Sequence, residues 1–399
     1  MSSKSKYVAK GTYGCVLKPA ASCASAKVKS KKMNGKVSKL FYNDKAIKEE
    51  YDIHMKIVQI VDPKGKFTVR AFGRCNLQYE NFVASELEHC TRLKSIKSAK
   101  ESEADETAET TASTAETTAS TAKTTASTAS VESNASSASS ESNDSDYEEV
   151  QMFNPGEKVR QIIYEDGGID LSSIISKHSM SFDSIFWAMQ NVFDGLVTLE
   201  KKGFVHLDIK PGNMVYTEKG NGKVAIIDFG LCTTLNKVLS RKMAYIHLHP
   251  YAVYPPEFMT MHKKKQLSDK RLINLAYVMQ FSRLPTEYGK GNRFWDAAID
   301  AFEGDVTFEP VASKIDVYSL GATLLMIYSN LKRKIFRSKQ NCTFVEDLIA
   351  GMIHVNPAKR FSPTQARKAY KAIIARFKSV APCPPKKERS PKTKRCITV

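Results

Sequence analysis

The chain has 399 residues, a net charge of +18 and 42% apolar residues. This apolar content excludes a wholly disordered chain, and the length allows two or three folding units or one large two-lobed domain. No run of 18 apolar residues occurs, so we expect no transmembrane helix, and the positive charge favours an anionic partner.

The cysteines and the N-terminus indicate the compartment. No C-x-x-C pair occurs, no apolar signal core follows Met1, and Ser2 stands where N-myristoylation needs glycine. We therefore expect reduced thiols in an intracellular protein, with neither a zinc site nor a disulfide framework. The eight cysteines are Cys15, Cys23, Cys75, Cys90, Cys232, Cys342, Cys383 and Cys396.

The first predicted element is a glycine-containing turn between Val8 and Val16. Gly11 and Gly14 flank Thr12 and Tyr13. Glycines allow backbone N–H groups to approach phosphates closely, although the same pattern fits an ordinary hairpin turn.

A strand is predicted over Lys36–Phe41, and a helix follows it. Lys39 lies between apolar Val37 and Leu40. Because the stretch 27–36 holds five other lysines, Lys39 could also be one more exposed lysine.

Residues 101–149 differ from their surroundings. Thr107 to Ser127 is three copies of a seven-residue Thr/Ala/Ser-rich unit without Leu, Ile or Val, which excludes a coiled coil. The segment has a net charge of −11, which leaves +29 on the rest of the chain. It cannot bury enough apolar surface to offset its ordering entropy, so we expect disorder.

Two further elements precede the most informative motif. Gln161 to Gly168 is typical of a strand that ends in a glycine turn. Apolar residues then recur at steps of three or four from Phe182 to Leu199, which predicts one helix that ends near Gly203.

The densest motif lies between 205 and 230, where His206 to Asn213 precedes a short strand, Val224–Ile227, and Asp228. An aspartate in a rigid loop, such as Asp208, can orient a hydroxyl and accept its proton, while Lys210 can reach a transferring phosphate. Asn213 and Asp228 can hold Mg²⁺ between them. The motif therefore favours phosphoryl transfer.

These residues resemble the eukaryotic protein kinase family. His206 to Asn213 matches H-x-D-x-K-x-x-N, and Asp228-Phe229-Gly230 matches D-F-G. The resemblance extends over residues 7–376 and implies an α+β, two-lobed protein kinase fold. It also implies ATP and Mg²⁺ as cofactors, protein substrates, and serine/threonine specificity because of Lys210.

The resemblance implies roles for small-lobe residues. Lys39 should contact the α and β phosphates and pair with Glu50, with Glu49 as the alternative. The backbones of Glu165 and Gly167 should bind adenine, with Tyr164 guarding the back pocket. The loop over the phosphates should be Val8, Ala9, Lys10, Gly11, Thr12, Tyr13, Gly14, Cys15 and Val16, with Ala9 in place of the first glycine.

Three later motifs fit the same family. Pro255-Pro256-Glu257 resembles A-P-E, Asp316 to Gly321 resembles the start of a buried central helix, and Asn356 to Arg360 resembles D-P-x-x-R. Arg360 should pair with Glu257. We expect a small lobe at 1–168 that contains the insertion, a large lobe at 169–380 and a basic tail at 381–399.

The sequence departs from the family in two places. Leu207 replaces the arginine that receives an activation-loop phosphate, which argues against that control. An insertion at about 258–314 separates two large-lobe motifs, and we interpret it as a substrate- or partner-binding elaboration. The insertions and the H-L-D loop resemble those of kinases encoded by large DNA viruses.

The tail has six Lys/Arg and four Pro between Pro382 and Arg395. A solvated tail is the simplest interpretation, with nuclear import or polyanion binding, including nucleic acid, as the alternative. Cys396 lies in a poor match to a prenylation box.

Two other functions compete with a serine/threonine protein kinase. A pseudokinase or scaffold would be expected to lack one of Lys39, Asp208, Asn213 and Asp228, and all four are present. A small-molecule phosphotransferase would not be expected to carry Lys210 together with the P-P-E and D-V-Y-S-L-G motifs.

Overall fold

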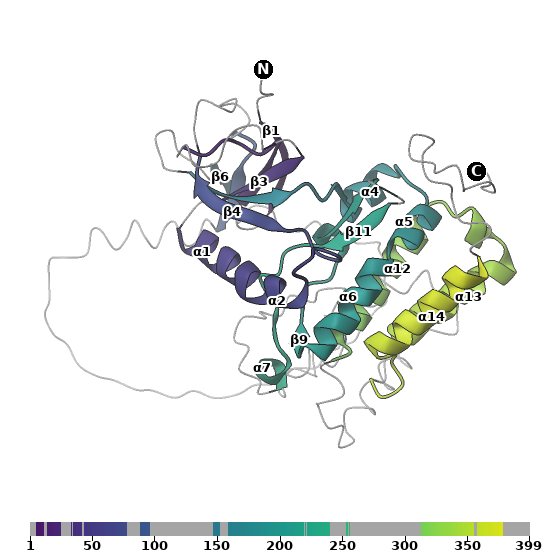
Figure 1. Cartoon of the computed structure of the whole chain (residues 1–399). Helices are drawn as coiled ribbons and strands as arrows, with labels where there is room; N and C mark the ends of the chain where they lie inside the picture. The colour runs from purple at the N-terminus through teal and green to yellow at the C-terminus, as the bar shows by residue number, and fades with distance from the viewer. Residues whose placement is uncertain are drawn as a thin grey trace, which may run out of the picture.

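A computed structural model shows two lobes, one built mainly of strands and one built mainly of helices (Figure 1). Across the described part of the chain, no helix has the length and apolar character needed to span a bilayer. The structure describes residues 5–11, 14–24, 33, 35–41, 44–77, 88–95, 147–151, 159–218, 220, 222–239, 253, 255, 313–354 and 357–377.

The small lobe is a five-stranded antiparallel sheet in the order β1-β2-β3-β7-β4. The strand predicted at Lys36–Phe41 is confirmed with the same bounds. Strand β3 lies between β2 and β7, and its residues alternate between partly buried and buried from Val37 to Leu40, as expected for a strand with two different faces. The strands are β1 (Lys6–Gly11), β2 (Gly14–Lys18), β3 (Lys36–Phe41), β4 (Ala71–Asn76) and β7 (Arg160–Glu165).

One helical segment packs on this sheet. It consists of α1 (Asp44–Ile53), a π-helical turn (His54–Val58) and α2 (Gln59–Val61). Ile47 of α1 is buried against Phe41 and Ile162 of the sheet. A buried side chain of this size contributes about 1.5–3 kcal/mol, which fastens the helix to β3 and β7.

The expectation of reduced thiols without disulfides is wrong for four cysteines of the small lobe. Cys15 is bonded to Cys90, and Cys23 is bonded to Cys75. The paired cysteines are 75 and 52 residues apart in the sequence, so their spacing does not predict the disulfides. Folding of the small lobe brings their Cα atoms within 6 Å of each other. Among the other described cysteines, Cys232 and Cys342 are free thiols.

A separate hairpin of the small lobe flanks the segment predicted at 101–149, which we call the acidic segment because of its net charge of −11. Strand β5 (Thr91–Ser95) pairs with β6 (Tyr147–Gln151), and Ser95 lies opposite Tyr147. The expectation of disorder over 101–149 is wrong for residues 147–149, which belong to β6. The rest of that segment, the 258–314 insertion and the 381–399 tail lie outside the described residues.

The large lobe contains β8 (Ile169–Asp170), which pairs with β10 in the three-stranded sheet β11-β10-β8. A second pair joins β9 to β12. The short elements are β9 (Phe204–Val205), β10 (Met214–Thr217), β11 (Lys223–Ile226), β12 (Thr233–Thr234), and 3₁₀ turns at Pro211–Asn213 and Ile335–Arg337.

Helices make up most of this lobe, and the single helix expected from Phe182 to Leu199 is two helices. The α-helical hydrogen-bond pattern is interrupted at Met189, whose N–H donates to Phe186 O, three rather than four residues back. The second helix ends at Lys201, and Gly203 follows with φ 72°. The helices are α4 (Leu171–Lys177), α5 (Phe182–Ala188), α6 (Gln190–Lys201), α7 (Leu235–Leu239), α12 (Ile315–Asn330), α13 (Lys339–Met352) and α14 (Pro363–Arg376).

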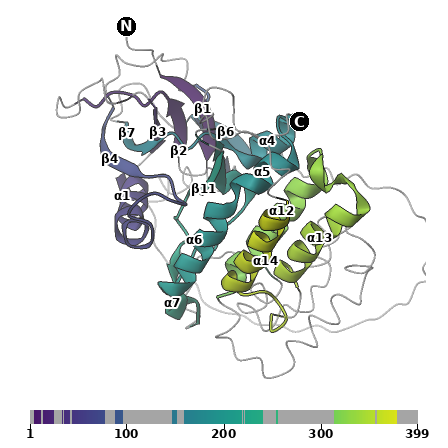
Figure 2. The same ribbon diagram turned by 45° about the vertical axis from the view of Figure 1, so that its right-hand side comes forward.

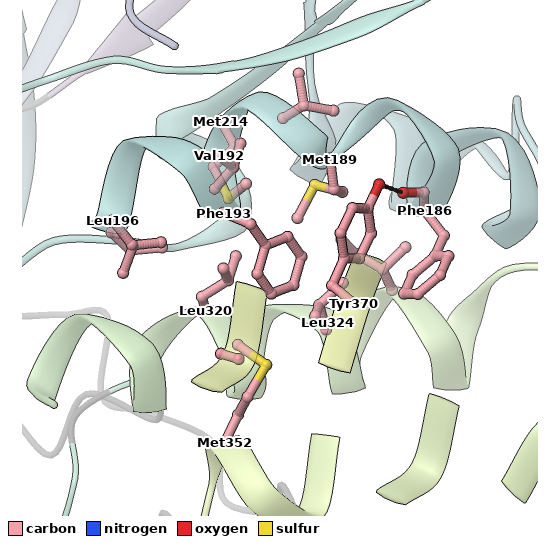
Figure 3. Packing of buried hydrophobic residues seen from close by; sticks show 14 of the residues in the cluster. Phe186, Met189, Val192, Phe193, Leu196, Met214, Leu320, Leu324, Met352 and Tyr370 are labelled. Atoms are coloured by element: carbon pink, nitrogen blue, oxygen red, sulfur yellow. Dashed lines mark hydrogen bonds between the residues drawn. The ribbon is translucent and has the colours of Figure 1, made fainter. Parts of the chain in front are cut away.

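The core of the large lobe lies between α6, α12, α13 and α14 (Figure 2). The Tyr370 ring stacks on Phe193 with centroids 4.2 Å apart, and its hydroxyl donates to Phe186 O at 2.8 Å (Figure 3). Helix α12 is buried along most of its length, as its continuous apolar sequence requires. This rigid packing supports the loops on the side of the large lobe that faces the small lobe.

The acidic segment joins two strand ends that are already paired, so it can be removed without breaking the ladder. Replacing residues 96–146 by Asn-Gly should keep Ser95 opposite Tyr147 in a two-residue hairpin. We expect the free energy of unfolding in denaturant melts to stay the same or to rise by up to about 3 kcal/mol, because each halving of a loop lowers its closure cost by about 0.6 kcal/mol. A loss of stability would show that the segment contributes to the folded lobe.

Candidate active site

The loop that carries Asp208 is fixed by a buried carboxylate from another element. Asp316, in the first turn of α12, accepts hydrogen bonds from His206 N at 2.7 Å and Leu207 N at 2.9 Å. Leu207 is in the left-handed region with φ 65°, which costs a non-glycine residue about 1–2 kcal/mol. The two hydrogen bonds hold this conformation and so set the direction in which the next residue, Asp208, leaves the loop.

Burial raises the pKa of Asp316 to about 6, and the hydrogen bonds from His206 and Leu207 oppose the rise. Its carboxyl is therefore ionised at neutral pH and can accept both hydrogen bonds. The neighbouring His206 has a pKa lowered to about 4, mainly by burial. It is neutral at neutral pH, and its Nδ1 accepts the Asp208 N–H at 3.2 Å.

Two side chains of the loop, those of Lys210 and Asn213, converge on Asp208. Lys210 Nζ lies 2.9 Å from Asp208 Oδ1, and Asn213 Nδ2 donates to Asp208 Oδ2 at 2.6 Å and to its carbonyl at 3.0 Å. Both partners of the Asn213 amide nitrogen are acceptors, so its Oδ1 is the atom left for another ligand.

The pKa of Asp208 is raised above its ordinary value, first by burial and also by the negative charge of Asp228. Lys210 and the hydrogen bond from Asn213 act in the opposite direction. A carboxylate with a raised pKa is a better proton acceptor than an exposed aspartate, provided that it stays ionised at working pH.

Asp228 follows β11 and is held next to the same loop. It has φ 60°, and its Oδ1 accepts the Gly230 N–H at 3.3 Å. Ile227 N donates to Asn213 O at 2.9 Å, which ties the two segments together. The Phe229 ring packs edge-on against His206 with centroids 4.5 Å apart. These contacts place the segment of Asp228 next to Asn213.

The small lobe contributes a lysine–carboxylate pair. Lys39 Nζ of β3 lies 2.5 Å from Glu50 Oε2 of α1, so Glu50 rather than Glu49 contacts Lys39. Tyr164 Oη of β7 donates to the other oxygen, Glu50 Oε1, at 2.8 Å. The pKa of Tyr164 is raised well above its usual range by burial, by Glu50 and by the charge of Asp228.

The glycine-containing turn connects β1 and β2. Gly11 pairs with Gly14, and a Cβ on Gly14 would lie 1.7 Å from Leu40 O, so only glycine fits there. The backbones of Val8, Ala9, Lys10 and Val16 lie in the two strands, while Thr12 and Tyr13 lie outside the described residues. Cys15 is fully buried in its disulfide, so only its backbone could serve a ligand.

The segment expected to bind adenine links the two lobes. Glu165 N donates to Arg70 O at 2.9 Å, and Asp166 N donates to Gly35 O at 3.0 Å. A Cβ on Gly167 would lie 2.6 Å from Val215 Cγ2 and 2.8 Å from Val69 Cγ2. Gly167 is therefore required by close packing between residues of both lobes.

The donor atoms fit a magnesium–nucleotide complex. Asn213 Oδ1 and the Asp228 carboxylate are hard oxygen ligands, which Mg²⁺ prefers. Within the described ranges, no group of three or more His, Cys, Asp or Glu is placed to hold a metal ion. Two protein ligands are typical of Mg²⁺ in phosphoryl-transfer sites, where phosphate oxygens and water supply the other ligands.

Two functional contacts were not predicted from the sequence. Asp316 was assigned only to the start of a buried helix, although an aspartate within an apolar run signals a buried hydrogen-bond acceptor. The bond from Tyr164 to Glu50 needs the strand register, which no local pattern gives. The expected Arg360–Glu257 pair cannot be placed, since Glu257 lies outside the described residues; Arg360 is buried and its Nε donates to His354 O.

Comparison with known proteins agrees with this geometry. Residues 151–271 match the family described as the protein kinase domain. This part of the chain is similar to protein kinase domains, and the strand-rich and helical lobes agree with the two-lobed protein kinase fold.

The chain is similar to several serine/threonine-protein kinases. It is 26% identical to serine/threonine-protein kinase stk11 of Xenopus laevis over 235 residues, which is 57% of this chain and 46% of that protein. It is 26% identical to serine/threonine-protein kinase STK11 of Gallus gallus over 206 residues, 51% and 39% of the two chains. A probable serine/threonine-protein kinase, mkcC of Dictyostelium discoideum, is 33% identical over 92 residues, 23% and 10%. The chain thus spans less than half the length of these relatives.

We expect Asp316→Asn to weaken both the fold and the site. The amide nitrogen would face a backbone N–H, so one hydrogen bond is lost and a buried donor is left unpaired, at a cost of about 2–4 kcal/mol. Thermal melts should show the loss, and phosphate transfer per folded molecule should fall because the Leu207 conformation is no longer held.

Asp183→Asn is the matched control. Asp183 is also buried and accepts backbone N–H groups of Lys334, Ile335 and Phe336, away from the catalytic loop. It should lower the melting temperature without changing activity per folded molecule. Equal activity losses in the two variants would contradict the specific role of Asp316.

Proposed function

We propose that the protein is a serine/threonine protein kinase that transfers the γ-phosphate of ATP to a protein hydroxyl. The observation that carries this proposal is the cluster in which Asp208 contacts both Lys210 and Asn213, while a hydrogen bond from Ile227 N to Asn213 O ties the segment of Asp228 to the same loop. The match to the protein kinase domain and the Lys39–Glu50 pair between β3 and α1 support it.

Each residue has a defined task in this proposal. The Asp208 carboxylate orients the attacking hydroxyl and accepts its proton, and Lys210 neutralises charge on the transferring group. Asn213 and Asp228 would hold Mg²⁺, which supplies charge neutralisation on the phosphates. Lys39, positioned by Glu50, would contact the α and β phosphates. The turn from Val8 to Val16 would cover them.

The remaining assignments concern recognition. The backbones of Glu165 and Gly167 would bind adenine. Lys210 supports serine/threonine rather than tyrosine specificity, in keeping with the relatives. The charge of +29 outside the acidic segment supports contact with an acidic protein, nucleic acid or another polyanion as an accessory function.

The main test is transfer from labelled ATP with Mg²⁺ to generic acidic and basic protein substrates, followed by identification of the phosphorylated residue. Asp208→Asn, Lys39→Met and Asp228→Ala should each reduce transfer by about a hundredfold or more while melting temperatures stay near that of the parent. Asp347→Asn, at an exposed position on α13, should leave the rate unchanged. Full activity in Asp208→Asn would overturn the mechanism.

The pH dependence provides a second test. Because the pKa of Asp208 is raised, its basic form is lost as pH falls at a point above the ordinary aspartate value of 3.8. The acid limb of the kcat profile should therefore lie above that of an unperturbed aspartate. Lys210→Met removes a charge that lowers this pKa, so the limb should move to higher pH. A limb that stays in place or moves down would contradict Asp208 as the titrating base.

A further inference from the structure

The carboxylate of Glu50 is held from two directions by residues of adjacent strands. Lys39 Nζ occupies Oε2 at 2.5 Å, and the Tyr164 hydroxyl occupies Oε1 at 2.8 Å. The side chains of Lys39 and Glu50 are largely withdrawn from solvent, with 17% and 15% exposed. Hydrogen bonds to a charged acceptor in such a place are among the stronger ones in proteins.

The sheet register explains why Tyr164 can reach Glu50. Strands β3 and β7 place Lys39 opposite Ile162 and Val37 opposite Tyr164. Residues two apart on a strand share a face, so Lys39 and Tyr164 both point toward helix α1. Tyr164 approaches the carboxylate from the strand next to that of Lys39.

A second contact fastens the same helix one turn later. His54, at the start of the π-helical turn, is buried, and its Nε2 accepts the Ala71 N–H at 3.0 Å. Ala71 is paired with Tyr164 across β4 and β7, and the His54 ring lies edge-on to the Tyr164 ring with centroids 5.7 Å apart. Burial lowers the pKa of His54 to about 4, so at neutral pH the ring is neutral and can accept this hydrogen bond. The helix is thus joined to the sheet through Glu50 and through His54, and Tyr164 touches both.

We infer that Tyr164 is a positioning residue, whose hydroxyl holds the Glu50 carboxylate in the orientation that pairs with Lys39. This inference deepens the proposed function and rests on it, because Lys39 is the residue assigned to the phosphates. Tyr164 has no assigned contact with the reacting atoms and acts through Glu50.

Tyr164→Phe is the direct test, since it removes only the hydroxyl. We expect kcat/KM to fall by about tenfold or more, as for the loss of a hydrogen bond to a charged group. Amide hydrogen exchange in 44–58 should become faster, and labelling of Lys39 by an amine-reactive reagent, read by mass spectrometry, should increase.

Tyr328→Phe is the matched control, because Tyr328 also donates to a glutamate, Glu346 Oε1, at 2.7 Å, within the large lobe. It should leave kcat/KM, exchange in 44–58 and Lys39 labelling as in the parent. If both variants lose activity alike, the role of Tyr164 is only structural and the inference fails.

A double-mutant cycle separates an action through Glu50 from any other. In a Glu50→Gln background, Tyr164→Phe should have little further effect on Lys39 labelling, because the carboxylate it positions is already gone. Additive effects would overturn the inference, as would kcat/KM, exchange and labelling in Tyr164→Phe all equal to those of the parent. Absence of phosphate transfer in the parent would instead refute the proposed function, and exchange and labelling would still decide whether Tyr164 holds Glu50.

Discussion

The catalytic loop depends on one buried carboxylate. Asp316 occupies the start of a helix whose remaining turns are packed on nearly every side, so its position is determined by the core of the large lobe. Because Asp316 is held in place, the two hydrogen bonds that it accepts fix the backbone of His206 and Leu207. Asp208, Lys210 and Asn213 can then converge because their common loop has one conformation. Preorganisation of this kind lets a site stabilise a transition state without rearranging.

In the small lobe, the position of Lys39 depends on contacts between the sheet and the helical segment 44–61. Ile47 supplies apolar contact, while Glu50 and His54 supply polar contacts to β3, β7 and β4. Leu207 stands where the resemblance to protein kinases would place an arginine that receives an activation-loop phosphate. The contacts of Ile47, Glu50 and His54 together hold α1 against the sheet.

Local patterns predicted much of this structure and missed what depends on long-range pairing. The strand at Lys36–Phe41, the motif around Asp208 and the end of a helix before Gly203 were visible because each is encoded within a few residues. The break at Met189 was not, since its residues keep the apolar period across it. The disulfides were missed because spacing rules apply to neighbouring cysteines, and sheet formation joins cysteines that are 52 and 75 residues apart.

The hairpin formed by β5 and β6 has a practical consequence. Its two strands meet at Ser95 and Tyr147, so the chain between them leaves and re-enters the lobe at a single point. Such a junction tolerates inserted sequences of very different length, because the two ends of the insert need only be close together. A fluorescent reporter or an affinity handle grafted there would travel with the small lobe while both chain termini stay as they are.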